Sequence, residues 1–406
     1  MGDAPVVAVQ DILADVRQRG DAALLDLTER FDGVRPDPLQ VPPAEVDAAL
    51  TAISPLLREA LEAAHASILA HHREQVRADT RSERDGTVVR ELHRPVDRAG
   101  LYVPGGRAKY PSTVLMTAVP ARVAGVAELA MTVPPGRDGT VAVETLAAAA
   151  IAGVDEVYRV GGAQAIAALA YGTESIRAVD VIVGPGNVYT ALAKRAVAAE
   201  GVVGVPAAFT GPSEVVVVAD DITPPEWAAI DVIVQAEHGP HGLAWLVTWS
   251  EEAADRICAA VDKLLVDAPR RAEIESTLQE GGYAVVCDGP EQAMAVANLI
   301  APEHLELMTA DPELLLPLVR CAGAVFCGMY SPASVGDYMA GPSHVLPTYG
   351  SARFASALRV DDFVKTIHVV SLDGAALSRV APHVAAIAEA EGLTAHAESV
   401  RIRGPR

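Results

Sequence analysis

The chain has 406 residues, half of them hydrophobic, and its 32 basic residues against 53 acidic ones give a net charge of −21. This length is enough to bury large cores in two or more domains, and this composition excludes wholesale disorder. A surface this acidic repels a phosphate backbone, which argues against a general nucleic-acid-binding protein.

The beginning of the chain shows no export or anchoring signal. It lacks the basic start and apolar run of a signal peptide, and Val6 breaks the myristoylation pattern. No uninterrupted apolar segment approaches the ~18 residues needed to cross a bilayer. We therefore expect a cytoplasmic protein.

Helices are predicted first, and a strand–helix alternation follows. Apolar residues recur at helical spacing in 11–30 and 44–77, which predicts surface-packed helices. From residue 98, "RAGLYVPGG" predicts a short strand that ends in a glycine turn. "STVLMTAVPARVAGVAELAMTVPP" and "ETLAAAAIAGVDEVYRVGG" each predict a helix, a glycine stop and a buried strand, and "VDVIVGPGN" begins a further round. This rhythm is typical of βαβ units in a mostly parallel sheet.

A second series of the same kind occupies the next part of the chain. Strands are predicted in "SEVVVVAD", "LAWLVTWS", "YAVVCDG" and "AGAVFCG", and helices at 225–236, 251–266 and 290–299. We expect two α/β domains with a boundary near residue 210, and a helical tail at 372–391. Four cysteines lie in this half without any C-x-x-C pair, so we expect unreactive core thiols: Cys258, Cys287, Cys321 and Cys327.

One glycine turn invites comparison with dinucleotide-binding loops. In "GPGNVY", residues 184–189, Tyr189 stands where the third glycine of the ordinary fingerprint would be. The two glycines and the proline still make a tight turn that opens a helix, and the N-terminus of that helix could face an anion. On these residues alone, a structural turn explains "GPGN" better than a ligand loop.

Polar residues gather in two segments of the second series. In "QAEHGPHG", Gln235 and His238 are three apart at a helix end, so they share a face and can supply two ligands to one metal ion. A surface or capping histidine explains the same pair. "SVGDYMAGPSHVLPT" places Asp337 and His344 in a loop rich in glycine and proline, which is typical of functional loops, although a capping aspartate also fits.

Two further segments join an acid to a histidine. "EGLTAHAESV" contains Glu391 and His396 in the tail, where a lone histidine is ordinarily a surface residue. "IAPEHLEL" sets Glu303 and His304 side by side in an apolar stretch. Metal binding, proton transfer and simple packing all remain open for this pair, because its partners lie elsewhere in the chain.

Taken together, these segments resemble the histidinol dehydrogenase family, zinc enzymes that complete histidine biosynthesis. The matching stretches keep one order along nearly the whole chain, from "RGDAALLDLTERFDG" through "GLYVPGG", "YPSTVLM", "VGPGN", "GPSEVVVVAD", "QAEH", "PEHLEL" and "HVLPT" to "EGLTAHAESV". The resemblance implies two incomplete Rossmann-like domains with mostly parallel sheets, and a small helical tail exchanged between the subunits of a homodimer. It assigns 1–101 with 214–358 to a domain that carries catalytic and zinc residues, 102–213 to an NAD-contacting domain and 359–406 to the dimerisation tail.

The resemblance also implies roles for individual residues. The family's zinc ligands match Gln235, His238, Asp337 and His396. Its catalytic pair matches Glu303 and His304. Its substrate contacts match Ser213, Gln235, His238, His304, Asp337, His344, Glu391 and His396. Its NAD contacts match Tyr102, Gln164 and Asn187, which turns "GPGN" from a structural turn into a cofactor loop.

The family reaction oxidises L-histidinol to L-histidine through L-histidinal in two hydride transfers to NAD. His304 fits the base that removes the hydroxyl proton, since an imidazole pKa lies near neutrality. Glu303 fits the base that activates water for the aldehyde, with a pKa raised by the apolar setting of Ile300 and Leu305. One zinc per subunit would orient the substrate. The resemblance also implies that Glu391 and the tail histidine complete the partner's site.

Three positions depart from the common family pattern beside functional residues: Ala207, Gly239 and Ser343. None removes a ligand or a base, but neighbours of this kind can retune a pocket. A paralogue that oxidises another small charged alcohol, such as a sulfopropanediol, therefore stays an alternative. So do a zinc hydrolase that uses Glu303 to activate metal-bound water and a non-catalytic zinc protein. Glu391, which suits a substrate ammonium group, favours histidinol.

Overall fold

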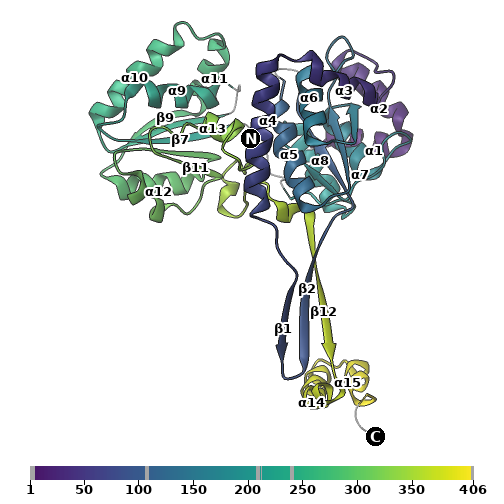
Figure 1. The fold of residues 1–406 in the computed structure, drawn as a ribbon. Helices are drawn as coiled ribbons and strands as arrows, with labels where there is room; N and C mark the ends of the chain where they lie inside the picture. The colour runs from purple at the N-terminus through teal and green to yellow at the C-terminus, as the bar shows by residue number, and fades with distance from the viewer. Residues whose placement is uncertain (1–4, 106–108, 207–210, 212, 238–241, 404–406) are drawn as a thin grey trace. The chain divides into compact units, whose positions relative to one another are not determined.

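The computed structural model describes residues 5–105, 109–206, 211, 213–237 and 242–403 (Figure 1). The chain divides into two compact units. The first comprises Met1–Gln75 and Val96–Phe363, and the second comprises Val76–Pro95 and Val364–Arg406. No helix in the described ranges is both long enough and apolar enough to span a membrane.

A parallel sheet of four strands forms the first core of the larger unit. Its spatial order is β5 (Glu156–Arg159), β4 (Glu128–Val133), β3 (Arg98–Tyr102) and β6 (Val181–Val183). The helices that follow these strands are α5 (Pro111–Ala124), α6 (Val143–Ala152), α7 (Gly162–Tyr171) and α8 (Val188–Ala199). Nearly every strand residue is buried, because helices cover both faces, and this explains the unbroken apolar sequences. The predicted strand–helix alternation is confirmed here.

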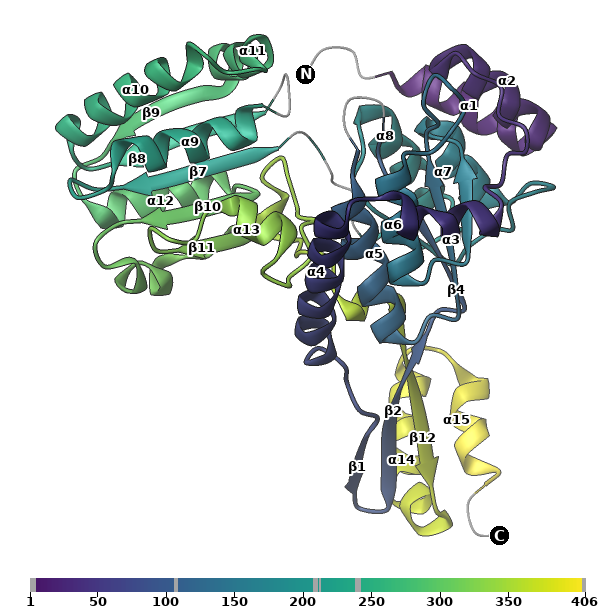
Figure 2. The same ribbon diagram turned by 45° about the horizontal axis from the view of Figure 1, so that its top comes forward.

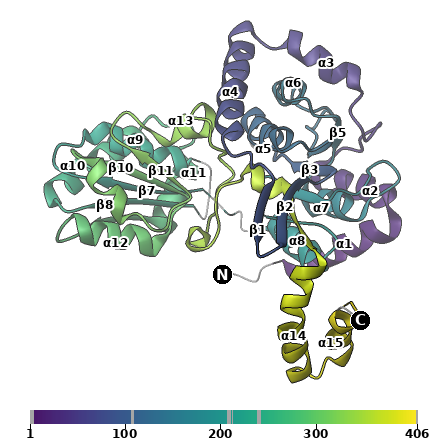
Figure 3. The same cartoon turned by 60° about the horizontal axis from the view of Figure 1, so that its bottom comes forward.

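Alternate strand residues serve two different cores. In β4, Leu129 and Met131 pack with α5 and α6, whereas Ala130 packs with α7. Four N-terminal helices extend the two layers: α1 (Val6–Arg19), α2 (Asp21–Asp32), α3 (Pro43–Ala52) and α4 (Pro55–Arg73). Helices α3 and α4 join the first core, and α1 and α2 join the second (Figure 3). The sequence predicts this segment as helical, but each predicted stretch is interrupted, at Gly20 and at 53–54.

These packing relations divide the chain differently from the division that the family resemblance implies. Residues 1–101 were expected to accompany 214–358, yet β3 pairs with β4 and β6, and α1–α4 pack on α5–α8. The cause is the parallel pairing of β3, which continues directly into the βα series that follows it. The three-part assignment of roles stays a prediction.

A second parallel sheet, of five strands, lies in the same unit (Figure 2). Its order is β11 (Ala324–Cys327), β10 (His304–Met308), β7 (Glu214–Ala219), β8 (Leu243–Thr248) and β9 (Gly282–Val286). One face is covered by α9 (Pro225–Ala236), α10 (Glu251–Leu265) and α11 (Arg271–Gly281), and α12 (Pro290–Ile300) belongs to the core of the other face. Shorter elements complete this part: η1 (Pro312–Leu314), η2 (Leu316–Leu318), α13 (Ala333–Tyr338), η3 (Ser351–Arg353) and η4 (Val360–Phe363).

Strand β10 was not predicted from the sequence, although it lies between β7 and β11. Its sequence, "HLELM", carries a histidine and a glutamate, but all five residues are buried. Helix α11 was also missed. The expectation that all four cysteines lie in the core is wrong for Cys258, which is exposed on α10. Its pKa is nevertheless raised by partial burial and by Asp262 and Asp255, which keeps the thiol protonated.

The second unit combines two segments that are far apart in sequence. Strands β1 (Thr80–Arg84), β2 (Thr87–Pro95) and β12 (Val364–Leu372) form an antiparallel sheet in that order. Helices α14 (Gly374–Ala390) and α15 (Thr394–Arg401) pack against each other. The helical tail predicted at 372–391 is confirmed as α14. The three strands escaped prediction because most of their residues are exposed, so no apolar alternation marks them.

Candidate active site

The catalytic pair expected from the sequence lies where α12 gives way to β10. Ala301 ends the helix in the left-handed conformation, and His304 begins β10 opposite Val215 of β7. Glu303 therefore precedes the strand, and its side chain does not have to follow the alternation of directions within β10. Both side chains point to one place, since Glu303 Oε2 lies 3.5 Å from His304 Nδ1. The pair sits at the amino edge of the five-stranded sheet.

The His304 ring is almost completely buried and is held from several sides. Its Nδ1 lies 3.0 Å from the carbonyl oxygen of Glu214, to which it can donate a hydrogen bond. Its Nε2 lies 3.5 Å from Asp337 Oδ1. The ring stacks on Phe326 with 5.8 Å between centroids. The structure thus brings together three of the predicted site residues, which are Glu303, His304 and Asp337.

Burial and charge shift the pKa values of the pair. Burial raises the pKa of Glu303 to about 7, the direction expected from the sequence. The nearby His304 cation and the main-chain N–H of Glu214 oppose the rise, and the carboxylates of Glu214 and Asp337 add to it. Burial opposes a charge on His304, but the carboxylates of Glu303 and Asp337 outweigh it and raise the pKa of the imidazole to about 9. That is above the neutral value expected from the sequence. A cation bound at Asp337 would oppose this rise.

Two of the four predicted zinc ligands lie in the described part of the first unit. Gln235, near the end of α9, is buried, and its amide nitrogen has no hydrogen-bond partner among the described residues. Asp337 lies on α13. His238 falls outside the described residues, and His396 lies on α15 in the second unit. In the described ranges, no three His, Cys, Asp or Glu side chains form a group suited to a metal ion.

The chemistry of this donor set nevertheless fits zinc. An amide oxygen, a carboxylate and two imidazoles are ligands that zinc accepts in mixed sites. Buried polar atoms are ordinarily hydrogen-bonded, yet the amide nitrogen of Gln235 has no partner among the described residues, so no contact there fixes the orientation of the amide through this atom. The side chain is therefore available to turn its oxygen to a metal ion.

The predicted substrate residues are placed in two units. Ser213 directly precedes β7, and its carbonyl accepts a hydrogen bond from Leu243 N–H. The ring of His344 contacts the Asp337 carbonyl at 2.9 Å through Nδ1 and the Thr113 hydroxyl at 3.2 Å through Nε2. Glu391 caps α14, and His396 lies in the first turn of α15. Both residues belong to the second unit and are exposed.

The predicted NAD residues gather at the carboxyl edge of the four-stranded sheet, where ligands of open α/β sheets ordinarily bind. Tyr102 ends β3, and its buried hydroxyl accepts a hydrogen bond from Gly162 N–H at 3.1 Å. Gln164 is buried on α7. Asn187 caps α8 by accepting the N–H groups of Tyr189 and Thr190. The cofactor role of these three residues stays a prediction.

The glycines of "GPGN" are explained by close packing. A Cβ on Gly184, whose φ is +111°, would lie 2.1 Å from the carbonyl oxygen of Tyr102. A Cβ on Gly186 would lie 2.0 Å from the Thr190 hydroxyl. The loop is thus a tight structural turn, and this same tightness exposes backbone near the start of α8.

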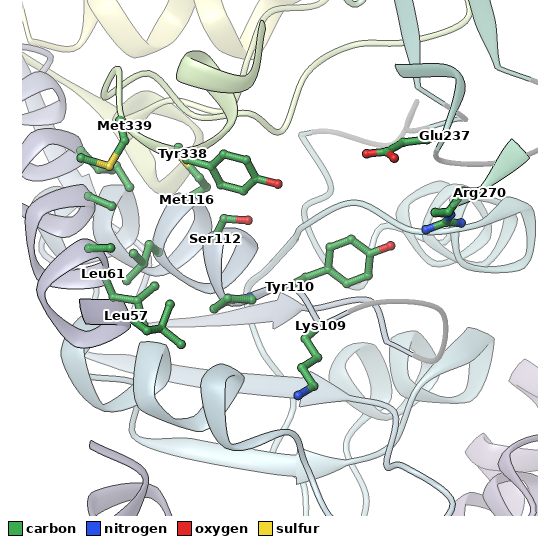
Figure 4. Close-up of a pocket in the computed structure, with 15 residues that line it drawn as sticks. Leu57, Leu61, Lys109, Tyr110, Ser112, Met116, Glu237, Arg270, Tyr338 and Met339 are labelled. Atoms are coloured by element: carbon green, nitrogen blue, oxygen red, sulfur yellow. The ribbon is translucent and has the colours of Figure 1, made fainter. Parts of the chain in front are cut away.

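A cavity of about 420 Å³ lies near the ends of the elements that carry Gln235 and Asp337. Its apolar lining comes from α4 and α5, and its polar lining includes Tyr110, Glu237 and Tyr338. Figure 4 shows Leu57 and Leu61 at one side and Glu237 with Arg270 at the other. The cavity has the size and mixed lining of a small-molecule site.

Comparison with known proteins decides the family. A family model described as histidinol dehydrogenase matches residues 3–404. The histidinol dehydrogenase of Parasynechococcus marenigrum is 51% identical over 396 residues, which cover 97% of this chain and 90% of that relative. The enzyme of the same name from a Synechococcus strain is 50% identical, with 98% and 91% covered. The chain belongs to the histidinol dehydrogenase family.

Solved structures agree with the histidinol dehydrogenase assignment. The crystal structure of histidinol dehydrogenase from Elizabethkingia anophelis superposes with a TM-score of 0.94 at 34% identity, covering 99% of this chain and 93% of that one. An acetylating aldehyde dehydrogenase from Geobacillus thermoglucosidasius reaches a TM-score of 0.51 at 15% identity, covering 90% and 96%. The second likeness shows a shared fold alone.

Three buried acids near the expected catalytic pair were not predicted from the sequence. Glu214 opens β7 and touches both members of the catalytic pair. The carboxyl groups of Asp231 on α9 and Glu306 on β10 are buried neighbours, and burial raises the pKa of both. Glu306 also accepts the N–H of Ala333, which begins α13. The available signal was a charged residue inside an apolar strand, because such residues are rarely buried without a specific partner.

Proposed function

We propose that this chain oxidises L-histidinol to L-histidine through L-histidinal, in two hydride transfers to two NAD, with one zinc ion per subunit. The observation that carries the proposal is the convergence of a buried acid, a buried base and a candidate metal ligand within 3.5 Å contacts, in a chain of this family. Gln235, His238, Asp337 and His396 would hold the zinc. Bound zinc would anchor and orient the substrate, and NAD would accept the hydride in both oxidations.

His304 removes the hydroxyl proton in the alcohol step. Its Nδ1 donates to the Glu214 carbonyl, so Nε2 is the nitrogen left to accept a proton. The resulting imidazolium is stabilised by Glu303 and Asp337, the same carboxylates that raise the pKa of His304 to about 9. A cation held at Asp337 would oppose that rise and favour the neutral imidazole, which is the form that can accept the proton as hydride leaves the adjacent carbon.

Glu303 serves the second step, in which water must add to the aldehyde. Burial raises the pKa of Glu303 to about 7, so at neutral pH the group can both accept and return a proton. Its carboxylate lies 3.5 Å from His304 Nδ1, where its charge stabilises the imidazolium formed in the first step. The adjacent residues thus act on different proton transfers.

The proposal extends to the assembly. The two sheets act as incomplete Rossmann-like halves, with NAD contacts from Tyr102, Gln164 and Asn187 at the carboxyl edge of the four-stranded sheet. The chain acts as a homodimer in which Glu391 and His396 complete the partner's site. The exposure of both residues on the second unit supports this arrangement, because neither is committed to a core.

A substrate panel tests the function. Zinc-loaded protein with NAD would be offered L-histidinol, other amino alcohols and hydroxy-sulfonates such as sulfopropanediol, while NADH absorbance is followed. We expect the highest kcat/KM with L-histidinol, and loss of activity after chelation that returns when zinc is restored. Turnover of a panel member without turnover of L-histidinol would contradict the proposal and establish the paralogous activity instead.

A further inference from the structure

Glu214 is a buried acid whose carboxyl group has no role in the mechanism given above. It is the first residue of β7 and is 1% exposed. Burial raises its pKa to about 7, partly offset by the N–H groups of Tyr349 and Glu303 that it accepts. An acid buried this deeply is ordinarily retained for what its oxygens bind.

Glu214 and Glu303 hold each other in a reciprocal pair of hydrogen bonds. Glu214 N–H donates to Glu303 Oε2 at 3.0 Å, and Glu303 N–H donates to Glu214 Oε2 at 3.3 Å. The Glu214 carbonyl also accepts the Nδ1–H of His304. The main-chain N–H of Glu214 thus holds the carboxylate of Glu303, and the carboxylate of Glu214 holds the main-chain N–H of Glu303.

The other oxygen of Glu214 reaches a different segment. Oε1 accepts the N–H of Tyr349 at 2.8 Å. Tyr349 has φ +55°, a conformation that costs a non-glycine residue free energy and therefore needs support. Its ring lies against Gly211, where a Cβ would be 2.1 Å from Tyr349 Cε2. One carboxylate thus joins the start of β7, the start of β10 and the loop that carries His344.

We propose that Glu214 is a positioning residue of this active site, one that fixes the Glu303 backbone and the turn at Tyr349 through its two carboxylate oxygens. The inference rests on the proposed roles of Glu303 and His304. Glu214 is not assigned a proton-transfer step, because its oxygens already accept two main-chain N–H groups. Its contribution is to keep the pair and the loop in one arrangement.

Because the side chain of Glu214 accepts two main-chain N–H groups, which we call the Glu214 clamp, a carboxylate and an amide should act differently at this position. Glu214→Gln has nearly the same shape but only one acceptor oxygen, so its NH2 group must face one of the two N–H donors. Glu214→Asp keeps two acceptors on a side chain that is one methylene shorter. The Asp variant should therefore recover part of what the Gln variant loses.

Thr223→Val is a matched control at the opposite end of the same strands. Thr223 is buried and its hydroxyl donates to the carbonyl of Met308, the last residue of β10. This isosteric change removes a buried hydrogen bond between the β7 and β10 segments without touching the catalytic pair. It therefore reports what a general loss of stability does to activity.

The experiment compares the zinc-loaded wild type with the three variants. We expect Glu214→Gln to lower kcat for L-histidinol and for L-histidinal ~10–100-fold, with KM for NAD changed less than ~3-fold, because a displaced catalytic group costs rate more than cofactor binding. Glu214→Asp should lie between Gln and wild type. Thr223→Val should keep kcat within ~2-fold while lowering the unfolding temperature. Wild-type kcat in Glu214→Gln, or an equal loss in Thr223→Val, would overturn the inference.

Amide hydrogen exchange tests the clamp independently of any substrate. Exchange at the Glu303 and Tyr349 amides should be faster in Glu214→Gln than in wild type, and unchanged in Thr223→Val. Wild-type exchange at both amides in Glu214→Gln would overturn the inference, whichever alcohol the enzyme oxidises. A wild-type protein inactive on L-histidinol would instead defeat the proposed function, and the exchange data would still decide the role of Glu214.

Discussion

Glu303 and His304 are adjacent in the chain, and adjacency ordinarily sends side chains in different directions. Here the direction changes between them, because Glu303 belongs to the loop after α12 and His304 to β10. Their side chains therefore meet, and the charge of each shifts the pKa of the other. The pair can divide two proton transfers because one member is buried next to carboxylates and the other is held by a main-chain N–H.

The division of labour predicts different losses in the two half-reactions. His304→Ala should lower oxidation of L-histidinol by ~100-fold or more, since a general base typically contributes 10²–10⁴-fold. Glu303→Ala should lower oxidation of L-histidinal more than oxidation of L-histidinol. Single-turnover measurements with each substrate, at equal zinc content, check this. Equal losses in both half-reactions for both variants would contradict it.

Lys194 is a second residue whose burial has a measurable consequence. It is fully buried, donates to the carbonyl of Gly184 beneath the "GPGN" turn and lies 5.9 Å from the centre of the Tyr102 ring. Burial lowers its pKa from 10.5 to about 7. Between these two values the unfolded chain binds more protons than the native state, so Lys194 destabilises the protein fully below pH 7 and progressively less up to pH 10.5.

Lys194→Met should therefore be more stable than wild type, and the difference in stability should be larger at neutral pH than at alkaline pH. The difference in unfolding free energy between variant and wild type should be larger at pH 7 than at pH 9.5 by on the order of 3 kcal/mol. Urea unfolding of both proteins at the two pH values checks this, and the pH dependence of all other groups cancels in the difference. A pH-independent difference would contradict the lowered pKa, because it would show that Lys194 keeps its proton in the native state at both pH values, as it does in the unfolded chain.

At the scale of elements, two short or polar segments carry much of the site. Helix α13 has six residues and holds Asp337, and β10 holds His304 within a charged sequence. Neither was predicted, because periodicity needs length and strand propensity favours apolar residues. Strands such as β7, with six buried residues in "EVVVVA", were predicted because nothing interrupts their apolar run.

The Asp231–Glu306 pair ties these elements together. Glu306 accepts the N–H that begins α13, and its partner Asp231 lies one turn before Gln235 on α9. Both members of this pair are buried, and burial raises the pKa of both carboxyl groups, which favours their protonated forms. The pair is therefore placed to keep the helices of two predicted zinc ligands in register.

Glu306→Leu should weaken zinc retention, whereas Glu306→Gln should preserve it. Leucine leaves Asp231 and the Ala333 N–H buried without partners, at a cost of ~2–4 kcal/mol of stability. Glutamine can accept from Ala333 and donate to Asp231. Chelator competition should show ~10–100-fold weaker zinc affinity for the Leu variant only. Equal zinc affinity in both variants would show that the Asp231–Glu306 pair does not support the metal site.

At the scale of the molecule, the sequence predicted the α/β class and the parallel sheets, since the βα rhythm repeats over many residues. In the second unit it predicted helix α14 but not the three-stranded sheet. Residues 80–95 and 364–372 form one sheet despite nearly 270 residues between them, and their exposed side chains give no periodic signal. Long-range pairing of polar strands is fixed by tertiary context rather than by local pattern.

The proposed exchange of tails predicts complementation between inactive variants. His304→Ala and His396→Ala should each be inactive alone. If the tail of one subunit serves the partner's site, each mixed dimer has one site with an intact His304 and an intact tail. A mixed dimer should then have about half of wild-type activity, and a randomly mixed population should have about a quarter. Dissociation, mixing and assay check this, with each variant remixed with itself as the control. Absence of recovery in verified mixed dimers would place each tail at its own site.

The yield of NADH per molecule of L-histidinol tests whether one enzyme carries out both oxidations. Limiting L-histidinol would be consumed to completion by the zinc-loaded wild-type enzyme in excess NAD, with the amino acid product identified. We expect two NADH for each L-histidinol, with L-histidine as the product. A yield of one NADH with the aldehyde as the final product, or no NADH from L-histidinol, would contradict it.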